Sequence, residues 1–277
     1  MRAFLPWWLL LLLLSGASPG LAAAQLCHMP APSMRADTRS DAVVMRASVG
    51  SVLAGYDNAF GEGEYQGGNV GLAFRHPWVA ASASLPGYRL VRNGEARTEI
   101  GDVALDARGT VYRDGEGGLA LGLGMGATLP SGNGNFGFGM GHTMLMPGLW
   151  MSFSREHLML SAELGYGRAI GGHHGMHHGA HAAHTGGFMA GSIVQPMNAS
   201  EVEHGLSLSY ELHPRVRALG RLFGAIPVAD EGGQAREIVA LGAQTILGLW
   251  DLTLETQLPV VGSPFTTRLV FAVGAEW

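Results

Sequence analysis

Hydrophobic and polar residues alternate one by one in short segments, each about ten residues long, between residues 42 and 277. The clearest segment covers residues 157–168. Its apolar positions are Leu158, Leu160, Ala162, Leu164 and Tyr166, and the positions between them are Met159, Ser161, Glu163, Gly165 and Gly167. Because successive side chains of a strand point to opposite faces, the segment predicts a strand with one face suited to lipid and the other to water.

Two further segments divide in the same way. Trp250, Leu252, Leu254 and Leu258 alternate with Asp251, Thr253, Glu255 and Gln257, and Leu206, Leu208, Tyr210 and Leu212 alternate with Ser207, Ser209, Glu211 and His213. Similar patterns cover residues 42–56, 65–75, 78–91, 101–113, 118–129, 142–153, 215–227, 236–247 and 264–277. The chain therefore predicts an all-β fold of about twelve strands, without helical periodicity.

The connections between these segments alternate between long and short. The odd connections are the longer ones, at residues 57–64, 92–100, 130–141, 169–200, 228–235 and 259–263, and the even ones centre on residues 76–77, 114–117, 154–156, 213–214 and 248. Outer-membrane barrels have short periplasmic turns and longer external loops. An even number of strands closes such a sheet without exposed edges. The pattern thus predicts a transmembrane antiparallel up-and-down β-barrel in the bacterial outer membrane.

The last strand supports the same interpretation. Thr267, Leu269, Phe271, Val273 and Ala275 alternate up to Trp277, an aromatic residue at the C-terminus. We expect Trp277 to act as an assembly signal read by the barrel-assembly machinery. A soluble sandwich or lipocalin-like barrel would also alternate, but its inward positions would form a packed apolar core, whereas here they are polar residues or glycine.

The N-terminus has the features of an export signal. Arg2 precedes an apolar run from Phe4 to Leu14, and Ala22, Ala23 and Ala24 supply small residues before a cleavage site. We predict a signal peptide over residues 1–24, a short periplasmic tail over residues 25–41 and the barrel over residues 42–277. A lipoprotein signal ending at Cys27 is the alternative, although the bulky Leu26 precedes that cysteine.

Composition narrows the function classes. The formal net charge is −5, which argues against a nucleic-acid partner, and Cys27 is the only cysteine, which excludes an intramolecular disulfide. The expected partners are the lipid bilayer, the assembly machinery and a small solute or metal ion. An outer-membrane enzyme is a third class, with Ser209 and His213 or Ser154 and His157 as conceivable pairs. The spacing of these residues does not reproduce a recognisable nucleophile motif, and we expect the protein not to be an enzyme.

Three short motifs resemble a known family. They are Gly101-Asp102-Val103 at the start of a strand, the glycine-rich strand from Gly122 that ends in Leu129-Pro130-Ser131-Gly132, and Leu164-Gly165-Tyr166. From residue 42 onward the chain resembles the MetA-type outer-membrane transporters associated with phenol-degradation pathways. Family members typically have Pro-Thr-Gly where this chain has Pro-Ser-Gly. The resemblance implies a twelve-stranded barrel that passes small solutes, and it brings no catalytic residues.

Histidines gather in the longest predicted external loop. His173, His174, His177, His178, His181 and His184 lie among glycines, and neutral imidazole is a ligand for Cu, Zn or Ni ions. Secondary metal candidates are Cys27, His28, Met29 and Met34 in the N-terminal tail, and His142, Met144 and Met146 on a strand. A loop under little constraint could also accumulate histidine and glycine without any metal function.

Charged residues occupy the predicted inward positions of several strands. They are Asp102, Asp106, Arg108, Glu163, Glu211, Arg217, Arg221, Asp251, Glu255, Arg268 and Glu276. Opposed acids and arginines inside a barrel can orient polar solutes in a channel, or they can pair and plug the lumen. The sequence thus predicts either a channel for small solutes or a non-conducting surface barrel with a structural or metal-binding role.

Overall fold

The computed structural model describes residues 43–58, 61–92, 94–114, 118–170, 193–194, 197–228, 234–262 and 265–277. Thirteen strands and one turn of 3-10 helix cover most of these residues. They are β1 (Val44–Asn58), β2 (Gly61–His76), β3 (Val79–Arg92), β4 (Glu95–Ile100), β5 (Val103–Arg113), β6 (Leu119–Leu129), η1 (Gly134–Phe136), β7 (Thr143–Arg155), β8 (Leu158–Ile170), β9 (Ser200–His213), β10 (Val216–Pro227), β11 (Arg236–Leu247), β12 (Trp250–Val261) and β13 (Thr267–Glu276).

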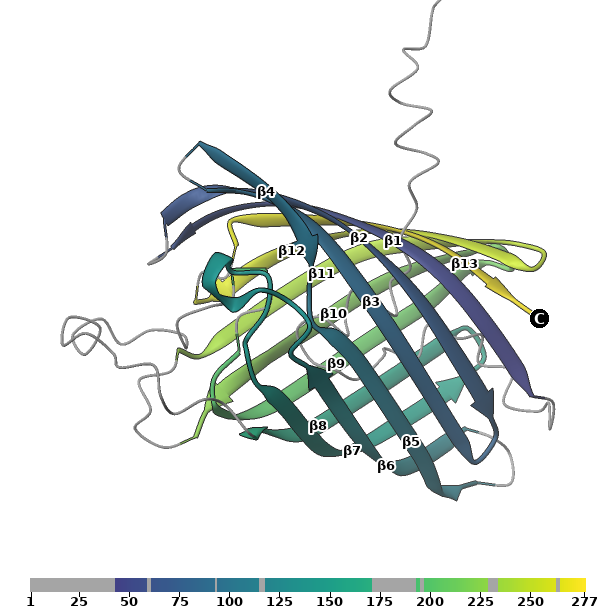
Figure 1. Ribbon diagram of the computed structural model, residues 1–277. Coiled ribbons are helices and arrows are strands. Elements are labelled where there is room, and N and C mark those ends of the chain that lie inside the picture. The colour runs from purple at the N-terminus through teal and green to yellow at the C-terminus, as the bar shows by residue number, and fades with distance from the viewer. Residues whose placement is uncertain are drawn as a thin grey trace, which may run out of the picture.

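All strands except β4 form one closed barrel (Figure 1). Each of these twelve strands pairs antiparallel with its neighbours, and β1 closes the ring by pairing with β13 on one side and β2 on the other. The predicted all-β, twelve-stranded antiparallel barrel is therefore confirmed. Closure leaves no barrel strand with an unpaired edge, which is the condition for strands to cross a lipid bilayer.

The strand β4 was not predicted. Residues 92–100 were expected to form a loop, but β3 continues to Arg92 and β4 pairs back along its outer half. The connection between β1 and β2 is also shorter than predicted, because both strands extend until only residues 59 and 60 separate them. The sequence contains no signal for these extensions beyond the barrel rim. Residues such as Glu95, Arg97 and Glu99 are polar and lack the alternation that marks a lipid-facing strand.

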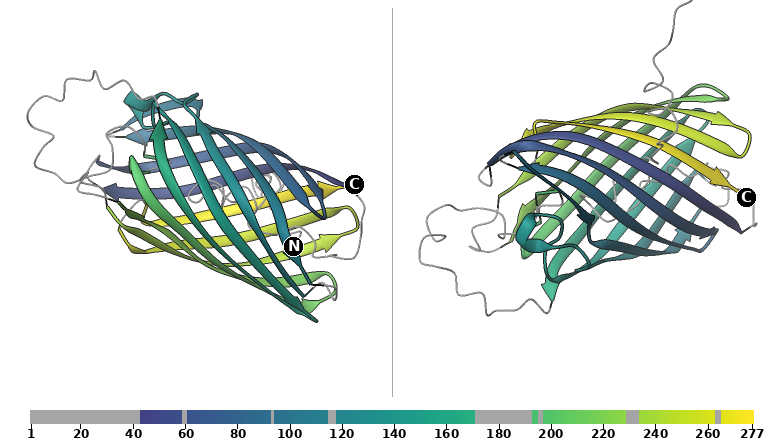
Figure 2. Two further views of the ribbon diagram at one scale, coloured as in Figure 1. Left: turned by 90° about the horizontal axis from the view of Figure 1, so that it is seen from below. Right: turned by 45° about the horizontal axis from the view of Figure 1, so that its top comes forward.

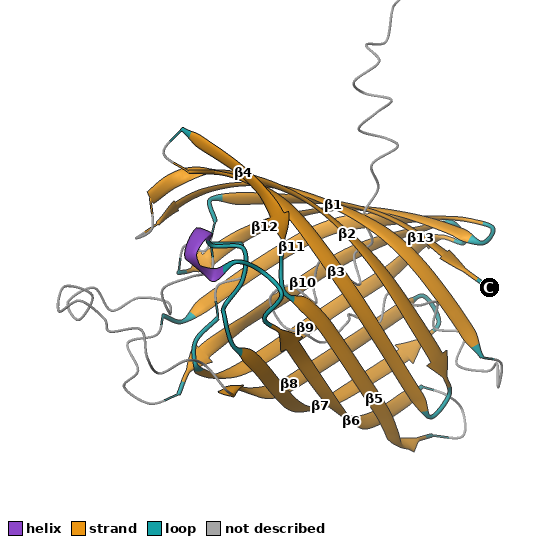
Figure 3. Ribbon diagram, viewed as in Figure 1, coloured by secondary structure: helices purple, strands orange, loops and turns teal. Residues whose placement is uncertain are grey.

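The two ends of the barrel differ (Figures 2 and 3). One end carries tight turns, including those at residues 77–78, 156–157, 214–215 and 248–249, where Glu156 and Gly248 have positive φ. The other end carries β4, η1 and the long connections. Since outer-membrane barrels place short turns in the periplasm, we refer to these ends as periplasmic and external. No helix within the described residues is long and apolar enough to cross a bilayer.

The outer face of the barrel is apolar. The side chains predicted for lipid are exposed here, among them Leu164 on β8, Leu206 on β9 and Leu254 on β12. Their neighbours along each strand are buried toward the barrel axis, as Thr253, Glu255 and Gln257 of β12 are. The alternation read from the sequence therefore separates the lipid face from the lumen.

The lumen is less polar than predicted. An apolar and aromatic cluster fills part of its external half, with side chains from β1, β2, β3, β10, β11 and β13 and from three connections. Its largest members are Tyr56, Tyr65, Tyr88, Phe138, Phe223 and Phe265. The expectation of polar residues or glycine in place of a packed apolar core holds for the periplasmic half, but is wrong for this cluster and for the buried Met144 and Met146 of β7.

Candidate solute path through the barrel

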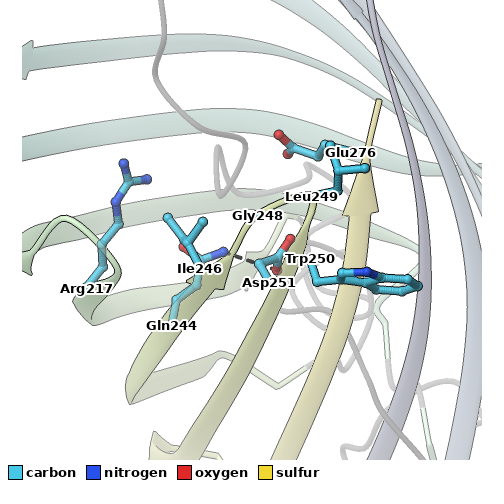
Figure 4. Close-up of a pocket in the computed structure, with 8 residues that line it drawn as sticks. All are labelled: Arg217, Gln244, Ile246, Gly248, Leu249, Trp250, Asp251 and Glu276. Atoms are coloured by element: carbon cyan, nitrogen blue, oxygen red, sulfur yellow. Dashed lines mark hydrogen bonds between the residues drawn. The ribbon is translucent and has the colours of Figure 1, made fainter.

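At the periplasmic end, one arginine holds two carboxylates together across the seam between β13 and β1. Arg46 Nη2 donates to Asp251 Oδ1 at 2.9 Å, and Arg46 Nη1 donates to Glu276 Oε1 at 3.1 Å. Gln244 Nε2 donates to the same Asp251 oxygen at 3.2 Å. Asp251, Glu276 and Gln244 line a pocket beside the β11–β12 turn, which Arg217 also lines (Figure 4). Arg217 Nη2 of β10 lies 3.8 Å from Glu211 Oε2 of β9.

Halfway along the axis, Arg108 of β5 reaches across the lumen wall to β8. Its Nε donates to Asp106 Oδ1 at 3.2 Å and its Nη1 donates to Glu163 Oε1 at 2.9 Å. The strands between carry glycine in the same row: Arg108 pairs with Gly124, Gly124 with Gly148, and Gly148 with Gly165. With no side chains in this row, the guanidinium of Arg108 can lie along the wall and meet a carboxylate three strands away.

The opposite wall carries a second chain of polar contacts at a similar height. Arg221 Nη1 lies 3.3 Å from Glu255 Oε2, and Glu255 also accepts a hydrogen bond from Gln257. Gln257 in turn accepts a hydrogen bond from Arg268 Nε at 2.6 Å. The guanidinium of Arg268 stacks on the Phe265 ring, where the polar chain meets the apolar cluster. Each member of this chain is supplied by β10, β12 or β13.

Near the external end, Arg236 of β11 and Glu201 of β9 form a bidentate pair. Arg236 Nη1 and Nη2 donate to the two oxygens of Glu201 at 2.8 and 2.6 Å, and both side chains have 0% exposure. Asn198 adds hydrogen bonds from its backbone and side-chain nitrogens to Glu201 Oε2. Glu203 is buried two residues further along β9. Polar side chains thus face the lumen at every level from the periplasmic pocket to this pair.

The sheet has a break where β3 leaves β5 and continues with β4. Pairing of β3 with β5 ends at Ser84 and Ala104, and pairing with β4 begins at Gly87 and Ile100. Ser131, from the connection after β6, fills the break. Its Oγ donates to Gly101 O at 2.8 Å and accepts from Val103 N at 2.9 Å. A side chain therefore replaces the missing ladder contacts.

Asp102 sits in this break and anchors the connection between β6 and β7 over the barrel mouth. Its two oxygens accept hydrogen bonds from Gly132 N at 2.9 Å and from Met140 N at 2.8 Å. Burial raises the pKa of the Asp102 carboxyl group, and the hydrogen bonds from Met140, Gly132 and Ser131 oppose that shift. The motifs Gly101-Asp102-Val103 and Pro130-Ser131-Gly132, which are far apart in the sequence, thus form one joint.

The anchored connection fills the external mouth. Phe138 is fully buried in the apolar cluster, and Ile193 packs over Gly137, where an added Cβ would lie 2.9 Å from Ile193 Cγ1. Gly137 has φ 92°, a conformation that favours glycine. Backbone hydrogen bonds from Ile193 and Val194 to Gly137 O hold the two connections together. The mouth is therefore lined by segments that precede β7 and β9.

Next to this joint lies a cluster made almost entirely of methionine. Met144, Met146 and Met197 are buried together, with Met140 and Ala169 packed against them. His142 lies in the same stretch of chain and is also buried, with Nδ1 3.1 Å from Met140 O. Burial lowers the pKa of the His142 imidazole, and the contact with Met140 O opposes that shift.

One polar pair faces outward near the external rim. His204 Nε2 of β9 lies 2.7 Å from Glu237 Oε1 of β11. The strand between them, β10, has Gly224 opposite both residues, so the two side chains meet over a position without a side chain. The pair therefore depends on glycine at residue 224.

The structure brings eight of the eleven predicted inward charges into three separate groups. Asp251 and Glu276 lie at the periplasmic end, Asp106, Arg108 and Glu163 share one contact set, and Arg221, Glu255 and Arg268 another. Glu211 pairs with Arg217 at the periplasmic rim, and Asp102 binds backbone instead of facing another charge.

Sequence reasoning missed several inward residues. They are Arg46, Asn198, Glu201, Glu203, Arg236 and Gln244. The alternation itself contains the signal for most of them, because Glu201 and Glu203 are in phase with Ser207 and Ser209 on β9, and Arg236 is in phase with Gln244 on β11. Nothing in the strand pattern would have identified Asn198, which precedes β9.

The predicted histidine loop lies outside the described residues, as does the tail with Cys27, His28, Met29 and Met34. In the part of the chain that the structure does describe, no three His, Cys, Asp or Glu side chains form a group that could hold a metal ion. Trp277 is at the end of the seam, where its backbone N and O both pair with Met45 at 3.0 Å.

A closed antiparallel barrel with an apolar outer face and charge pairs in its lumen has the fold of outer-membrane barrels. The family described as "Putative MetA-pathway of phenol degradation" matches residues 36–180, slightly more than half of the 277 residues. The chain belongs to this family, which confirms the resemblance stated above. No protein with a curated description matches the chain in sequence.

Solved structures show the same fold at low identity. The COG4313 outer membrane channel from Pseudomonas putida F1 has a TM-score of 0.63 and 12% identity, over 84% of this chain and 95% of that chain. The NanC porin has a TM-score of 0.52 and 10% identity, over 85% and 99% of the two chains. The KdgM porin gives 0.51 and 8%, over 83% and 99%.

Proposed function

We propose that this protein is an outer-membrane channel for small polar solutes. The observation that carries the proposal is the series of inward polar groups, which runs from the pocket at Asp251 and Glu276 through Arg108 and Glu163 to the Glu201–Arg236 pair. Paired charges and hydrogen-bonding groups along a lumen can replace water around a passing solute. The solved channel and porins with this fold are consistent with the same class of function.

The balance of charge favours cations as solutes. Within the described strands and the joint before β5, inward carboxylates outnumber inward arginines. The acids are Asp102, Asp106, Glu163, Glu201, Glu203, Glu211, Asp251, Glu255 and Glu276, and the arginines are Arg46, Arg75, Arg108, Arg113, Arg217, Arg221, Arg236 and Arg268. An excess of fixed negative charge lowers the energy of a cation in the path relative to an anion.

Planar-bilayer recording of the purified barrel tests this function. We expect discrete single-channel steps and, under a salt gradient, a reversal potential of the sign that marks cation preference. Glu163→Gln should reduce that preference, because it removes one inward negative charge, whereas Glu95→Gln on the exposed strand β4 should leave it unchanged. Absence of steps, or anion preference in the parent, would contradict the proposal.

A non-conducting barrel is the second candidate, and the filled mouth favours it. Phe138 and Ile193 cover the external end of the lumen as part of the apolar cluster. If this cover is a partial plug in a channel, Phe138→Ala should raise single-channel conductance. If the barrel conducts neither as parent nor as Phe138→Ala, the surface role replaces the channel.

We further propose that the loop from His173 to His184 recruits Cu, Zn or Ni ions to the cell surface. Six histidines among glycines supply enough imidazole ligands to surround one ion. Calorimetry on the full barrel should show metal-dependent heat that disappears when His173, His174, His177 and His178 are replaced by alanine. Equal binding by this variant would overturn the loop proposal and leave the channel unaffected.

The remaining parts of the proposal concern location and solute identity. We propose that the chain is exported by its N-terminal signal, inserted by the assembly machinery and resident in the outer membrane; the barrel fold and the sequence pattern support this location, and we assign no enzymatic step. The family description refers to phenol degradation. Uptake by a deletion strain should therefore be compared for aromatic compounds as well as for metal ions.

A further inference from the structure

The methionine cluster at the barrel mouth has the composition of a soft-metal site. We infer that Met144, Met146 and Met197, together with His142, bind a monovalent soft cation, Cu(I) or Ag(I), just inside the external mouth. Thioether sulfur is a ligand that selects Cu(I), and imidazole completes such sites. The inference concerns residues other than the histidine loop and does not depend on conduction through the barrel.

Two segments bring the three sulfur atoms together. Met144 and Met146 are neighbouring inward positions of β7, and Met197 comes from the connection that leads into β9. Their exposed fractions are 0%, 0% and 2%. Gly167 of β8 gives them room, because an added Cβ there would lie 3.0 Å from Met144 Cε and 3.4 Å from Met146 Cγ. The cluster is therefore part of the barrel wall and does not belong to a single loop.

The cluster differs from ordinary core packing in what surrounds it. Its buried members are all methionine, and it is separate from the larger apolar cluster of tyrosine, phenylalanine and aliphatic side chains. Flexible methionine fills irregular gaps in many cores, but there it usually mixes with leucine, isoleucine and phenylalanine. A Cβ added at Gly167 would also lie 3.4 Å from Glu201 Cγ, so the cluster borders the side chain that pairs with Arg236.

His142 provides an independent observation. Its side chain is 2% exposed, and the alternation of β7 continued back by two residues puts it on the inward face with Met144. Met140 O can only accept a hydrogen bond, so the contact at 3.1 Å requires a proton on Nδ1. Nε2 has no hydrogen-bond partner among the described residues.

A buried nitrogen without a partner is costly unless something else satisfies it. The arrangement matches that of a metal-binding histidine, which donates one ring N–H to a backbone carbonyl and offers the lone pair of the other nitrogen to the ion. Asp102 contributes indirectly, because it binds Met140 N and so fixes the carbonyl that orients the His142 ring. Three sulfur atoms and one nitrogen fit the low coordination number of Cu(I).

The experiment is a Cu(I) competition titration on the full-length barrel in detergent, under anaerobic conditions with a chromophoric Cu(I) chelator. In the parent for this titration, serine replaces the six histidines of the loop and also Cys27, His28, Met29 and Met34 of the N-terminal tail, so that these other candidate sites do not contribute. We expect one equivalent of Cu(I) per barrel. Met144→Leu/Met146→Leu should weaken it by more than the roughly 10–100-fold that loss of an outer-shell partner costs.

The control is Met125→Leu/Met151→Leu, since both side chains are exposed on the outer face of β6 and β7. This pair should bind Cu(I) as the parent does. Leucine conserves the volume of methionine, and the heat-modifiable band on gels reports whether each variant still forms the barrel. A second measurement, which needs no variant, is the methyl NMR spectrum. Ag(I) should shift the methyl resonances of Met144, Met146 and Met197 but not those of Met125 or Met151.

Two results would overturn the inference. One is unchanged Cu(I) affinity in the assembled Met144→Leu/Met146→Leu barrel. The other is addition of Ag(I) without shifts of the three cluster methyl groups. Should the double variant fail to assemble, the methyl spectrum of the parent alone decides.

Discussion

At the scale of single residues, the interior of this barrel shows how charged side chains are stabilised in a low-dielectric environment by contact with an opposite charge. Arg46, Arg108 and Arg236 each contact at least one carboxylate at 3.2 Å or less. Removing one partner of such a buried pair usually lowers the free energy of unfolding by more than the intact pair contributes to it, because the other charge remains desolvated. The pairs therefore restrict which single substitutions the barrel tolerates.

Glu201→Gln should destabilise the barrel by about 3–5 kcal/mol, because buried Arg236 loses its bidentate carboxylate. Denaturant unfolding in detergent measures the change. Replacing Glu201 and Arg236 together by apolar residues should cost less than the single variant. Glu95→Gln, in a pair that is largely exposed, should cost less than about 1 kcal/mol. Similar losses at both sites would contradict the interpretation.

Asp102 should make the mouth sensitive to pH. Its carboxyl pKa is raised by burial, so the folded state binds the proton more tightly than the unfolded chain does. The resulting stability is present at low pH and is lost as the pH rises from about 3.9 through the raised pKa. Hydrogen exchange of amides 131–142, corrected for intrinsic rates, should show protection falling over that range in the parent.

Asp102→Asn removes this titration and provides the control. Its protection should vary less with pH than that of the parent. Protection should also be lower by about 0.5–1.5 kcal/mol at low pH, since an amide offers one acceptor oxygen to Gly132 N and Met140 N instead of two. A parent whose protection rises with pH over this window would show that another group controls the joint.

At the scale of strands, glycine decides where side chains can cross from one strand to another. On the lumen side, Gly124, Gly148 and Gly165 let Arg108 reach Glu163, and on the lipid side Gly224 lets His204 reach Glu237. Gly224 is the more sensitive position. An added Cβ there would lie 2.1 Å from Arg236 O, a backbone atom, and 2.8 Å from Glu237 Oε2.

Gly224→Ala should therefore lower the free energy of unfolding by about 1–3 kcal/mol, the usual cost of overpacking. Gly220→Ala is the matched control on the same face of β10, because its Cβ would meet only Leu241 Cδ2 at 3.9 Å. That variant should be close to neutral. Equal effects in denaturant unfolding would show that strand propensity, and not the crossing pair, determines the cost.

At the scale of the whole molecule, closure of the barrel depends on one seam, where the first strand of the chain pairs with the last. Trp277 and Met45 exchange backbone hydrogen bonds where β13 meets β1. Deletion of Trp277 should leave most of the protein unassembled, as judged by the heat-modifiable band in outer-membrane fractions. Trp250→Ala, which removes another exposed aromatic ring near the same end, should assemble normally. Normal levels of the truncated barrel would contradict a role in assembly.

The sequence by itself determined the strands and their faces. A strand in a membrane barrel must put apolar side chains toward lipid at every second residue, and this local requirement is written directly in segments such as 157–168 and 250–258. Loop lengths added the order and direction of the strands. These properties depend on neighbours in the chain, so no knowledge of distant contacts was needed.

Only the tertiary structure decided which inward residues meet. Arg108 finds Glu163 because the two intervening strands and β8 itself carry glycine in one row, and Ser131 fills a break that exists only because β3 pairs with two different strands. The inward aromatic residues, such as Tyr88 and Phe223, follow the same alternation as polar ones and converge only when the barrel closes. Shear and curvature set these distances, and neither is encoded in the period of a single strand.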